Sequence, residues 1–308
     1  MHSQSRVSLL AAVGSLIAAL LVCGCAEPDR SGTVKIGGSS LMAPITEAWV
    51  KALKNKPHPL PMELSSDGST SAIERLLTGE LDVATSSRRI KTEELLTAQS
   101  RGVKIEESYA GFLIYTVLVH PSNPVTSITT EQLTGLFTRK IKDWSELGGP
   151  KQPISAVYRR VKPGEYDHFF ERVVQRPGFR PDPADQGTVV IDNPPDILAK
   201  VASSPLAAGY LLACDLGQGA GVKVLTLKRT PDDKPAQPTV AAALEGSYPL
   251  LRPLYLYINR ASPKPVRYFR DFVLGDEGRQ IATNAGMVPL PKRRGEVDAS
   301  RFTEMLSW

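Results

Sequence analysis

The chain has 308 residues, of which 42% are hydrophobic, and a formal net charge of +5. This length is enough for one large domain or two medium ones with an ordinary apolar core. The small positive charge is spread along the chain; it favours an anionic ligand and argues against a nucleic-acid-binding surface.

The first 25 residues have the pattern of an export signal. Arg6 precedes an uncharged apolar run from Val7 to Val22, and Cys23-Gly24-Cys25 follows it. The run is shorter than the roughly 20 apolar residues that a membrane-spanning helix needs. Its ending resembles the bacterial lipobox, and this resemblance implies that Cys25 is diacylated and becomes the mature N-terminus. We therefore predict a signal peptide over residues 1–25, a linker over 26–32, and an exported protein that is lipid-anchored in the periplasm or at the cell surface.

Cleavage and acylation would leave Cys214 as the remaining one of the three cysteines, so no intrachain disulfide is expected. We expect Cys214 to be a small buried apolar residue rather than a reactive thiol. His58, His120 and His168 lack metal-ligand spacing, and we predict neither a metal site nor a cofactor.

Hydroxyl-rich turns follow three short apolar strands in the first third of the chain. These turns are Gly37-Gly38-Ser39-Ser40-Leu41, Ser65 through Ser71, and Ser86-Ser87-Arg88-Arg89. The first two precede predicted helices, whose unpaired N–H groups and dipole favour a bound oxyanion. A single such turn is more often a plain N-cap. Ligands of open α/β sheets collect beyond the C-terminal ends of strands, so three such ends together point to one anion site.

Two pairs of residues have capping-box spacing and predict helix starts. They are Ser71 with Glu74 and Thr129 with Gln132. A further strand over 154–158 ends in the basic turn Arg159 through Glu165, where a guanidinium could bind a tetrahedral oxyanion at two points. We expect Arg88 to lie at the site where the three hydroxyl-rich turns converge. We expect Arg89 to be a solvent-exposed basic residue.

Two long apolar runs frame the middle of the chain. They cover 111–119 and 254–258, and we predict that both are strands crossing between two α/β domains. The first domain is then discontinuous, with residues 33–116 plus 255–308, and the second domain covers 117–254.

Several short sequences, in this order and spacing, carry a family resemblance over nearly all of the mature chain. They include Gly38-Ser39-Ser40 with Pro44, Gly68 through Ser71, His120 through Pro124, Trp144 through Gly149, Arg252 through Tyr255, and Gly286 through Leu290. The chain resembles the phosphate-binding proteins of the phosphate ABC transporter, which are class II periplasmic binding proteins. The resemblance implies a two-domain Venus-flytrap fold that captures phosphate or a similar oxyanion for an ABC importer, without catalysis. It also implies a monomer that contacts the permease subunits, with no nucleic-acid partner.

The same resemblance implies a set of ligand-binding residues. They are Ser39, Ser40, the backbone of Leu41, Thr70, Ser87, Arg88, Arg159, Gly164 and Glu165. Pro163-Gly164-Glu165 stands where the family usually has Ser-Gly-Thr, and Ser87 stands where some members have an aspartate that accepts the proton of phosphate. Either Glu165 takes over this acceptor role, or it points to solvent and complements the dipole of its helix.

Two other classes of function remain open from the sequence. One is a degenerate relative that serves as a sensor or interaction protein without anion binding. The other is an extracytoplasmic hydrolase, for which the chain offers no Gly-x-Ser-x-Gly, Ser-x-x-Lys or His-Glu-x-x-His motif and no Walker loop.

Overall fold

The computed structural model describes residues 32–160, 169–170, 173, 180–217 and 221–290, and all structural statements concern these residues. The chain first alternates strands and helices. These elements are β1 (Val34–Gly38), α1 (Ala43–Lys54), β2 (Met62–Ser65), α2 (Ser69–Thr78), β3 (Val83–Ser86) and α3 (Thr92–Ser100). A 15-residue strand, β4 (Ile105–Val119), then leads away from them.

The middle of the chain contains shorter elements. They are β5 (Ser127–Thr129), α4 (Thr130–Phe137), β6 (Ser155–Arg159), β7 (Thr188–Ile191), α6 (Pro194–Ser203), β8 (Ala207–Leu212), β9 (Lys223–Val224), β10 (Thr226–Lys228) and α7 (Val240–Leu244). The chain returns along β11 (Leu251–Asn259) and continues with α8 (Lys264–Leu274) and α9 (Asp276–Asn284). The described residues also include two short 3-10 helices, Trp144–Leu147 and Ala213–Asp215.

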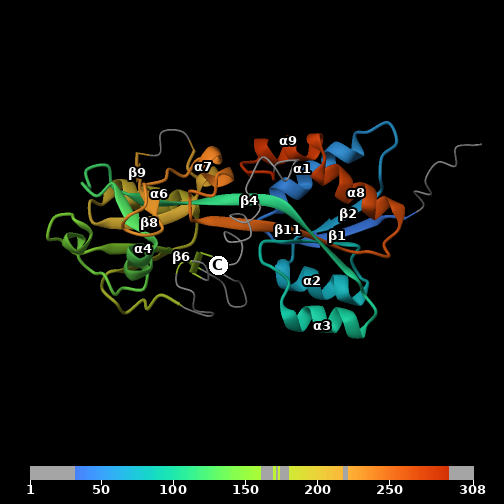
Figure 1. Ribbon diagram of the computed structural model, residues 1–308, viewed down its shortest axis with the longest axis horizontal. Coiled ribbons are helices and arrows are strands. Elements are labelled where there is room, and N and C mark those ends of the chain that lie inside the picture. The colour runs from blue at the N-terminus through green and yellow to red at the C-terminus, as the bar shows by residue number, and fades with distance from the viewer. Residues whose placement is uncertain (1–31, 161–168, 171–172, 174–179, 218–220, 291–308) are drawn as a thin grey trace, which may run out of the picture.

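Nine of the described strands form a curled mixed sheet in two lobes, and β5 and β10 pair as a separate two-stranded sheet. The order along its main path is β2-β1-β3-β11-β4-β8-β6-β7, and β9 also pairs with β4. Figure 1 shows β4 and β11 running side by side between the lobes, with α1, α2, α3, α8 and α9 on one side and α4, α6 and α7 on the other. β4 pairs with β11 through Ile114 and with β8 from Tyr115 onward, so the two halves of the sheet share this strand.

Both predicted crossing strands are therefore present. The C-terminal end of β4 pairs with β8, so the sheet of the second lobe begins on this crossing strand. The ladder between β4 and β11 contains a β-bulge, where Leu254 faces Gly111 and Tyr255 faces Tyr109. The extra residue, Ala110, lies on β4, and such a residue bends the strand that carries it.

Of the two helix starts predicted from capping-box spacing, the structure confirms one. The capping box at Thr129 is confirmed, since Thr129 Oγ1 accepts from the N–H of Gln132 at 3.1 Å. The one at Ser71 is wrong, because α2 begins earlier, at Ser69, after Gly68 with φ of 94°. The hydroxyl of Ser71 instead donates to Asp67 Oδ2 at 2.8 Å.

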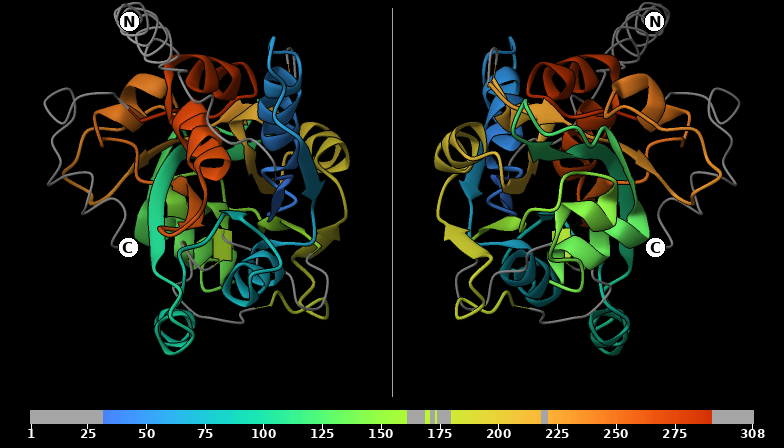
Figure 2. Two further views of the ribbon diagram at one scale, coloured as in Figure 1. Left: turned by 90° about the vertical axis from the view of Figure 1, so that its right-hand side faces the viewer. Right: turned by 90° about the vertical axis from the view of Figure 1, so that its left-hand side faces the viewer.

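Aromatic side chains fill the cores of the two lobes. Trp49 of α1 is fully buried, and its indole N–H donates to the carbonyl of Gly278 at 2.8 Å, which ties α1 to α9. In the other lobe the rings of Phe169 and Tyr210 are stacked with centroids 3.6 Å apart, and Phe137 packs edge-on against both. At the edge of the molecule, α3 has only Ala98 buried (Figure 2).

Candidate functional site

A cavity of about 730 Å³ lies where the C-terminal ends of several strands meet. Its lining comes from both lobes. The polar lining residues are Ser39, Ser40, Ser66, Asp67, Ser69, Thr70, Ser71, Ser87, Arg88, Tyr115, Arg159, Arg160, Tyr210, Cys214, Asp215 and Arg252. Hydroxyl groups and guanidinium groups outnumber carboxylates here, and this chemistry suits an oxyanion.

The turn between β1 and α1 lies against the end of β3. The N–H of Ser39 donates to the carbonyl of Thr85 at 3.0 Å, and the hydroxyls of Ser39 and Ser87 are 3.0 Å apart. Only glycine fits before Ser39, because a Cβ on Gly38 would lie 1.7 Å from Thr85 Oγ1. The N–H of Leu41 donates to Ser39 Oγ at 3.3 Å, a long bond that leaves this N–H available to a competing anion.

The start of α2 forms a second part of the wall. The N–H of Gly68 donates to the carbonyl of Gly38 at 2.9 Å, which places α2 beside the first turn. No side chain caps α2, although its first N–H groups have no acceptor within the helix. Ser69 Oγ accepts from the N–H of Ser87 at 3.1 Å, so that the second and third turns are also joined.

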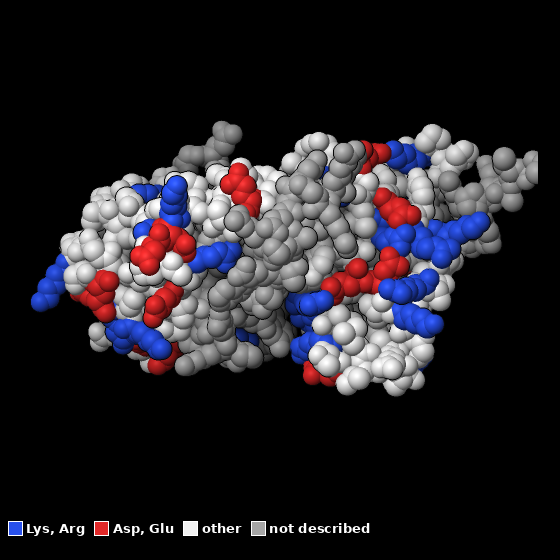
Figure 3. All heavy atoms as spheres, viewed as in Figure 1, with Lys and Arg blue, Asp and Glu red and all other residues white. Residues whose placement is uncertain are grey.

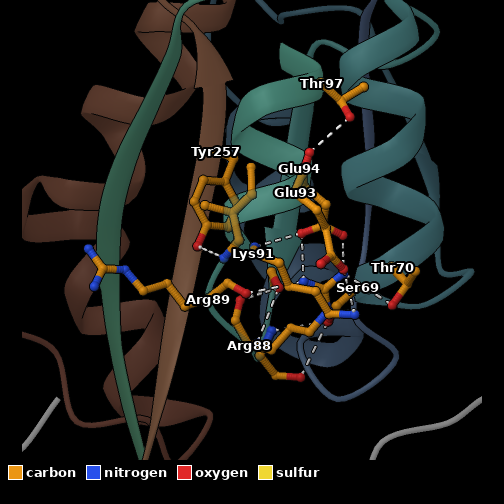
Figure 4. Close-up of polar contacts among 12 residues, drawn as sticks. Ser69, Thr70, Arg88, Arg89, Lys91, Glu93, Glu94, Thr97 and Tyr257 are labelled. Atoms are coloured by element: carbon orange, nitrogen blue, oxygen red, sulfur yellow. Dashed lines mark hydrogen bonds and ion pairs between the residues drawn. The ribbon is translucent and has the colours of Figure 1, made fainter. Parts of the chain in front are cut away.

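Arg88 is held by a carboxylate behind this wall. Its Nη2 and Nη1 lie 2.6 and 2.9 Å from the two oxygens of Glu94, and both side chains are nearly buried, at 9% and 11% exposed. Nη2 also donates to Thr70 Oγ1 at 3.2 Å, as Figure 4 shows. Burial acts to raise the pKa of Glu94, but hydrogen bonds from Arg88 and from the N–H of Lys91 outweigh it and leave this pKa below its usual value. The charge of Arg88 is thus already balanced by Glu94.

Arg252 on β11 is a cavity residue that sequence reasoning missed. Its Nη2 donates to Ser87 Oγ at 2.7 Å and its Nη1 donates to the hydroxyl of Tyr115 at 3.0 Å. The available signal was a single basic residue within the otherwise apolar strand from Leu251 to Ile258. Its partner Ser87 is 165 residues away, and no local pattern reports such a pairing.

The second lobe contributes Arg159 at the end of β6. Arg159 is exposed to the cavity and makes no ion pair with any carboxylate in the part of the chain that the structure describes. Its neighbour Arg160 pairs with Asp192 at 2.6 Å. Burial raises the pKa of Asp215, while the charge of Arg159 acts in the opposite direction. Arg159 therefore presents a guanidinium that a bound anion can neutralise.

The expectation that Cys214 is buried is wrong. The residue is exposed at the cavity wall rather than buried. Partial shielding of the thiol from water by neighbouring protein atoms, together with the charge of Asp215, raises the pKa of Cys214 to about 11. The thiolate is therefore disfavoured at neutral pH, as expected for an unreactive cysteine.

Seven of the nine residues predicted to bind the ligand line this cavity. They are Ser39, Ser40, Leu41, Thr70, Ser87, Arg88 and Arg159. Gly164 and Glu165 lie outside the described residues. Within the described ranges, no cluster of three or more His, Cys, Asp or Glu side chains could hold a metal ion.

The surface offers no alternative ligand site of strong charge on the face shown in Figure 3. Basic and acidic side chains are interspersed there over the described parts of both lobes. In the same described ranges, no helix has the length and apolar character required to cross a bilayer.

Comparisons with known proteins show the family of the chain. Residues 25–277 match the family model of a PBP superfamily domain. The chain is 28% identical to the protein SphX of Synechococcus elongatus, over 96% of this chain and 89% of that protein. It is 30% identical to the phosphate-binding protein PstS of Staphylococcus epidermidis, over 86% of this chain and 81% of that protein.

Two solved structures share the fold. A phosphate transport receptor from Vibrio cholerae superposes with a TM-score of 0.71 at 22% identity, over 84% of this chain and all of that one. A Clostridium perfringens substrate-binding protein of a phosphate ABC transporter, solved with bound phosphate, has a TM-score of 0.62 at 26% identity, over 84% of this chain and all of that one.

Proposed function

Because the chain belongs to the PBP superfamily, and within it to the PstS-like phosphate-binding proteins, we propose that it captures inorganic phosphate in the cleft between its two lobes and delivers it to an ABC importer. It is a binding protein of the two-domain class II type rather than an enzyme. Its relatives include phosphate-binding proteins and a phosphate transport receptor.

One observation carries the proposal. Hydroxyls of three strand-to-helix turns and the uncapped start of α2 line one cavity between the lobes, together with Arg159 and Arg252, which form no ion pair with a described carboxylate. All of these groups donate hydrogen bonds to an oxyanion, and the two arginines also supply positive charge. Closure of the lobes would bring Arg159 towards Ser39, Ser40 and Thr70, so that both lobes bind the ligand together.

The finer assignments are part of the same proposal. The ligand-binding residues are those predicted from the sequence, including Gly164 and Glu165, with Arg88 acting from behind Thr70. The lobes correspond to residues 33–116 plus 255–308 and to 117–254. Diacylation of Cys25 anchors the monomeric protein to the membrane beside its permease, and the lipobox resemblance supports this anchor.

Calorimetric titration with inorganic phosphate, together with a thermal-shift panel of phosphate, sulfate, molybdate and phosphonates at fixed ionic strength, tests the function. Phosphate at a hundred times its dissociation constant should stabilise the fold by about 2.7 kcal/mol. Absence of any shift across the panel would instead support a degenerate sensor. Turnover of a chromogenic phosphate ester would support a hydrolase.

A further inference from the structure

Arg252 joins the two central strands at the wall of the cavity. It stands on β11, it contacts Tyr115 on β4 and Ser87 after β3, and all three residues line the cavity. Its Nε is buried without a hydrogen-bond partner among the described residues, and no described carboxylate forms an ion pair with it. Two hydroxyl oxygens therefore hold the guanidinium of Arg252, and no described carboxylate neutralises its positive charge.

The chemistry of these contacts fixes the direction of the hydrogen bonds. A guanidinium only donates, so Ser87 Oγ must accept from Arg252 Nη2 across their 2.7 Å contact. The single proton of the Ser87 hydroxyl must then be donated to another group. The nearest described hydroxyls are those of Ser39 at 3.0 Å and Ser69 at 3.4 Å; each already accepts one backbone N–H and has one acceptor position left. An oxyanion is a stronger acceptor of the Ser87 proton than either hydroxyl.

We propose that Arg252 is a positioning residue of the anion site, which acts by holding Ser87 as a hydrogen-bond donor. This inference rests on the proposed phosphate-binding function. Arg88 has the same relation to Thr70, because its Nη2 donates to Thr70 Oγ1 and leaves the threonine proton for another acceptor. Arg252 and Arg88 thus each occupy one acceptor position of a cavity hydroxyl, which favours donation by Ser87 and Thr70 to anion oxygens that carry no proton.

A double-mutant cycle tests the positioning role, with calorimetric titration of inorganic phosphate as the measurement. Arg252→Gln should weaken phosphate binding by about tenfold in the wild-type background, the scale of one charge-assisted hydrogen bond. In the Ser87→Ala background the same change should weaken binding by less than about threefold, because the group through which Arg252 acts is missing. Arg260→Gln is the matched control, since Arg260 is exposed, does not line the cavity and carries the same charge.

The pH profile gives a second readout, which a merely structural role would not change. Wild-type affinity should rise as phosphate loses its second proton, because Ser87 and Thr70, as donors, bind unprotonated oxygens better. Arg252→Gln removes the charged donor to Ser87, so that this hydroxyl can accept a hydrogen bond from protonated phosphate and the pH profile should become flatter. Arg252→Lys retains the charge, and it keeps the test available if the glutamine variant does not fold.

Three results would overturn the inference. Equal losses from Arg252→Gln in both backgrounds would show that Arg252 binds the anion directly. An affinity unchanged by Arg252→Gln would remove any role for it at the site. A wild-type protein that binds no phosphate would refute the proposed function itself, and a titration of the unmodified protein distinguishes this case from the other two.

Discussion

The guanidinium of Arg88 and the carboxylate of Glu94 meet at two points in a nearly buried position behind the cavity. Glu94 also accepts the N–H of Lys91 at 2.8 Å, so the same carboxylate caps α3. This pair connects the start of α3 to Thr70 in the cavity wall through Arg88.

Loss of the Glu94 carboxylate should destabilise the protein strongly. Glu94→Gln leaves the charge of Arg88 buried without its partner, and we expect the free energy of unfolding in urea to fall by about 3 kcal/mol. Glu93→Gln is the control, because the Glu93 side chain is 76% exposed and its ion pair with Lys91, at 3.4 Å, lies at the surface. We expect it to cost less than about 0.5 kcal/mol. Similar losses from both variants would contradict the structural role of the buried pair.

The same pair predicts a pH dependence. The pKa of Glu94 is lowered in the folded protein, so its stabilising effect is present above the unfolded-state pKa and is lost as the pH falls through the folded-state pKa. Acid titration of stability should therefore be shallower in Glu94→Gln than in the wild type. Parallel curves would show that Glu94 does not contribute to acid unfolding.

Arg159 should account for much of the binding energy from the second lobe. Arg159→Ala should weaken phosphate binding by about 1.5–3 kcal/mol, the scale of a hydrogen bond to a charged group. Lys140 is also exposed but does not line the cavity, and Lys140→Ala should change the affinity little. Calorimetry compares the two variants, and equally small effects would place the anion elsewhere.

Glu165 tests how the protein distinguishes phosphate from sulfate. An ionised carboxylate only accepts, and monohydrogen phosphate has a proton to donate, whereas sulfate at neutral pH has none. If Glu165 faces the ligand, the phosphate-to-sulfate affinity ratio should shrink markedly in Glu165→Gln, because a like-charge penalty against sulfate is removed. An unchanged phosphate-to-sulfate ratio would support the alternative, in which Glu165 points to solvent and complements the dipole of its predicted helix.

Gly111 at the β-bulge should tolerate no side chain. Its φ is +153°, and a Cβ there would lie 2.5 Å from the carbonyl oxygen of Val288. Gly111→Ala should cost roughly 3 kcal/mol or more, because backbone strain and overpacking add. Gly102 also has positive φ but open space around it, so Gly102→Ala isolates the backbone strain at about 1 kcal/mol. If thermal unfolding showed equal losses of stability in the two variants, the backbone at Val288 would have moved to accommodate the new Cβ at little cost.

The sequence predicted the strands and turns well where the signal was local. The runs that became β4 and β11, the three hydroxyl-rich turns and the capping box at Thr129 all depend on neighbouring residues. The start of α2 was misplaced because Ser71 and Glu74 have the right spacing, whereas Gly68 has the backbone conformation that ends the turn. Propensity patterns do not distinguish nearby residues that can each begin a helix.

The parts of the site that depend on long-range contacts could not be predicted. Arg252 became a cavity residue because β11 lies between β3 and β4 in the sheet, and this order is not visible in the strand's own sequence. Arg88 was expected at the ligand from its position beside three turns, and the structure shows that its guanidinium is shared with Glu94 and Thr70. The exposure of Cys214 likewise depends on the cavity beside it.

The sharing of β4 between both halves of the sheet has a consequence for cooperativity. An excised fragment of residues 120–250 would lack the strand that pairs with β8, and the bared edge of β8 would offer unpaired backbone groups to other chains. Such a fragment should aggregate rather than fold. Because both halves of the sheet pair with β4, unfolding of one half would disrupt the strand pairing of the other. The intact chain should therefore unfold in a single calorimetric transition.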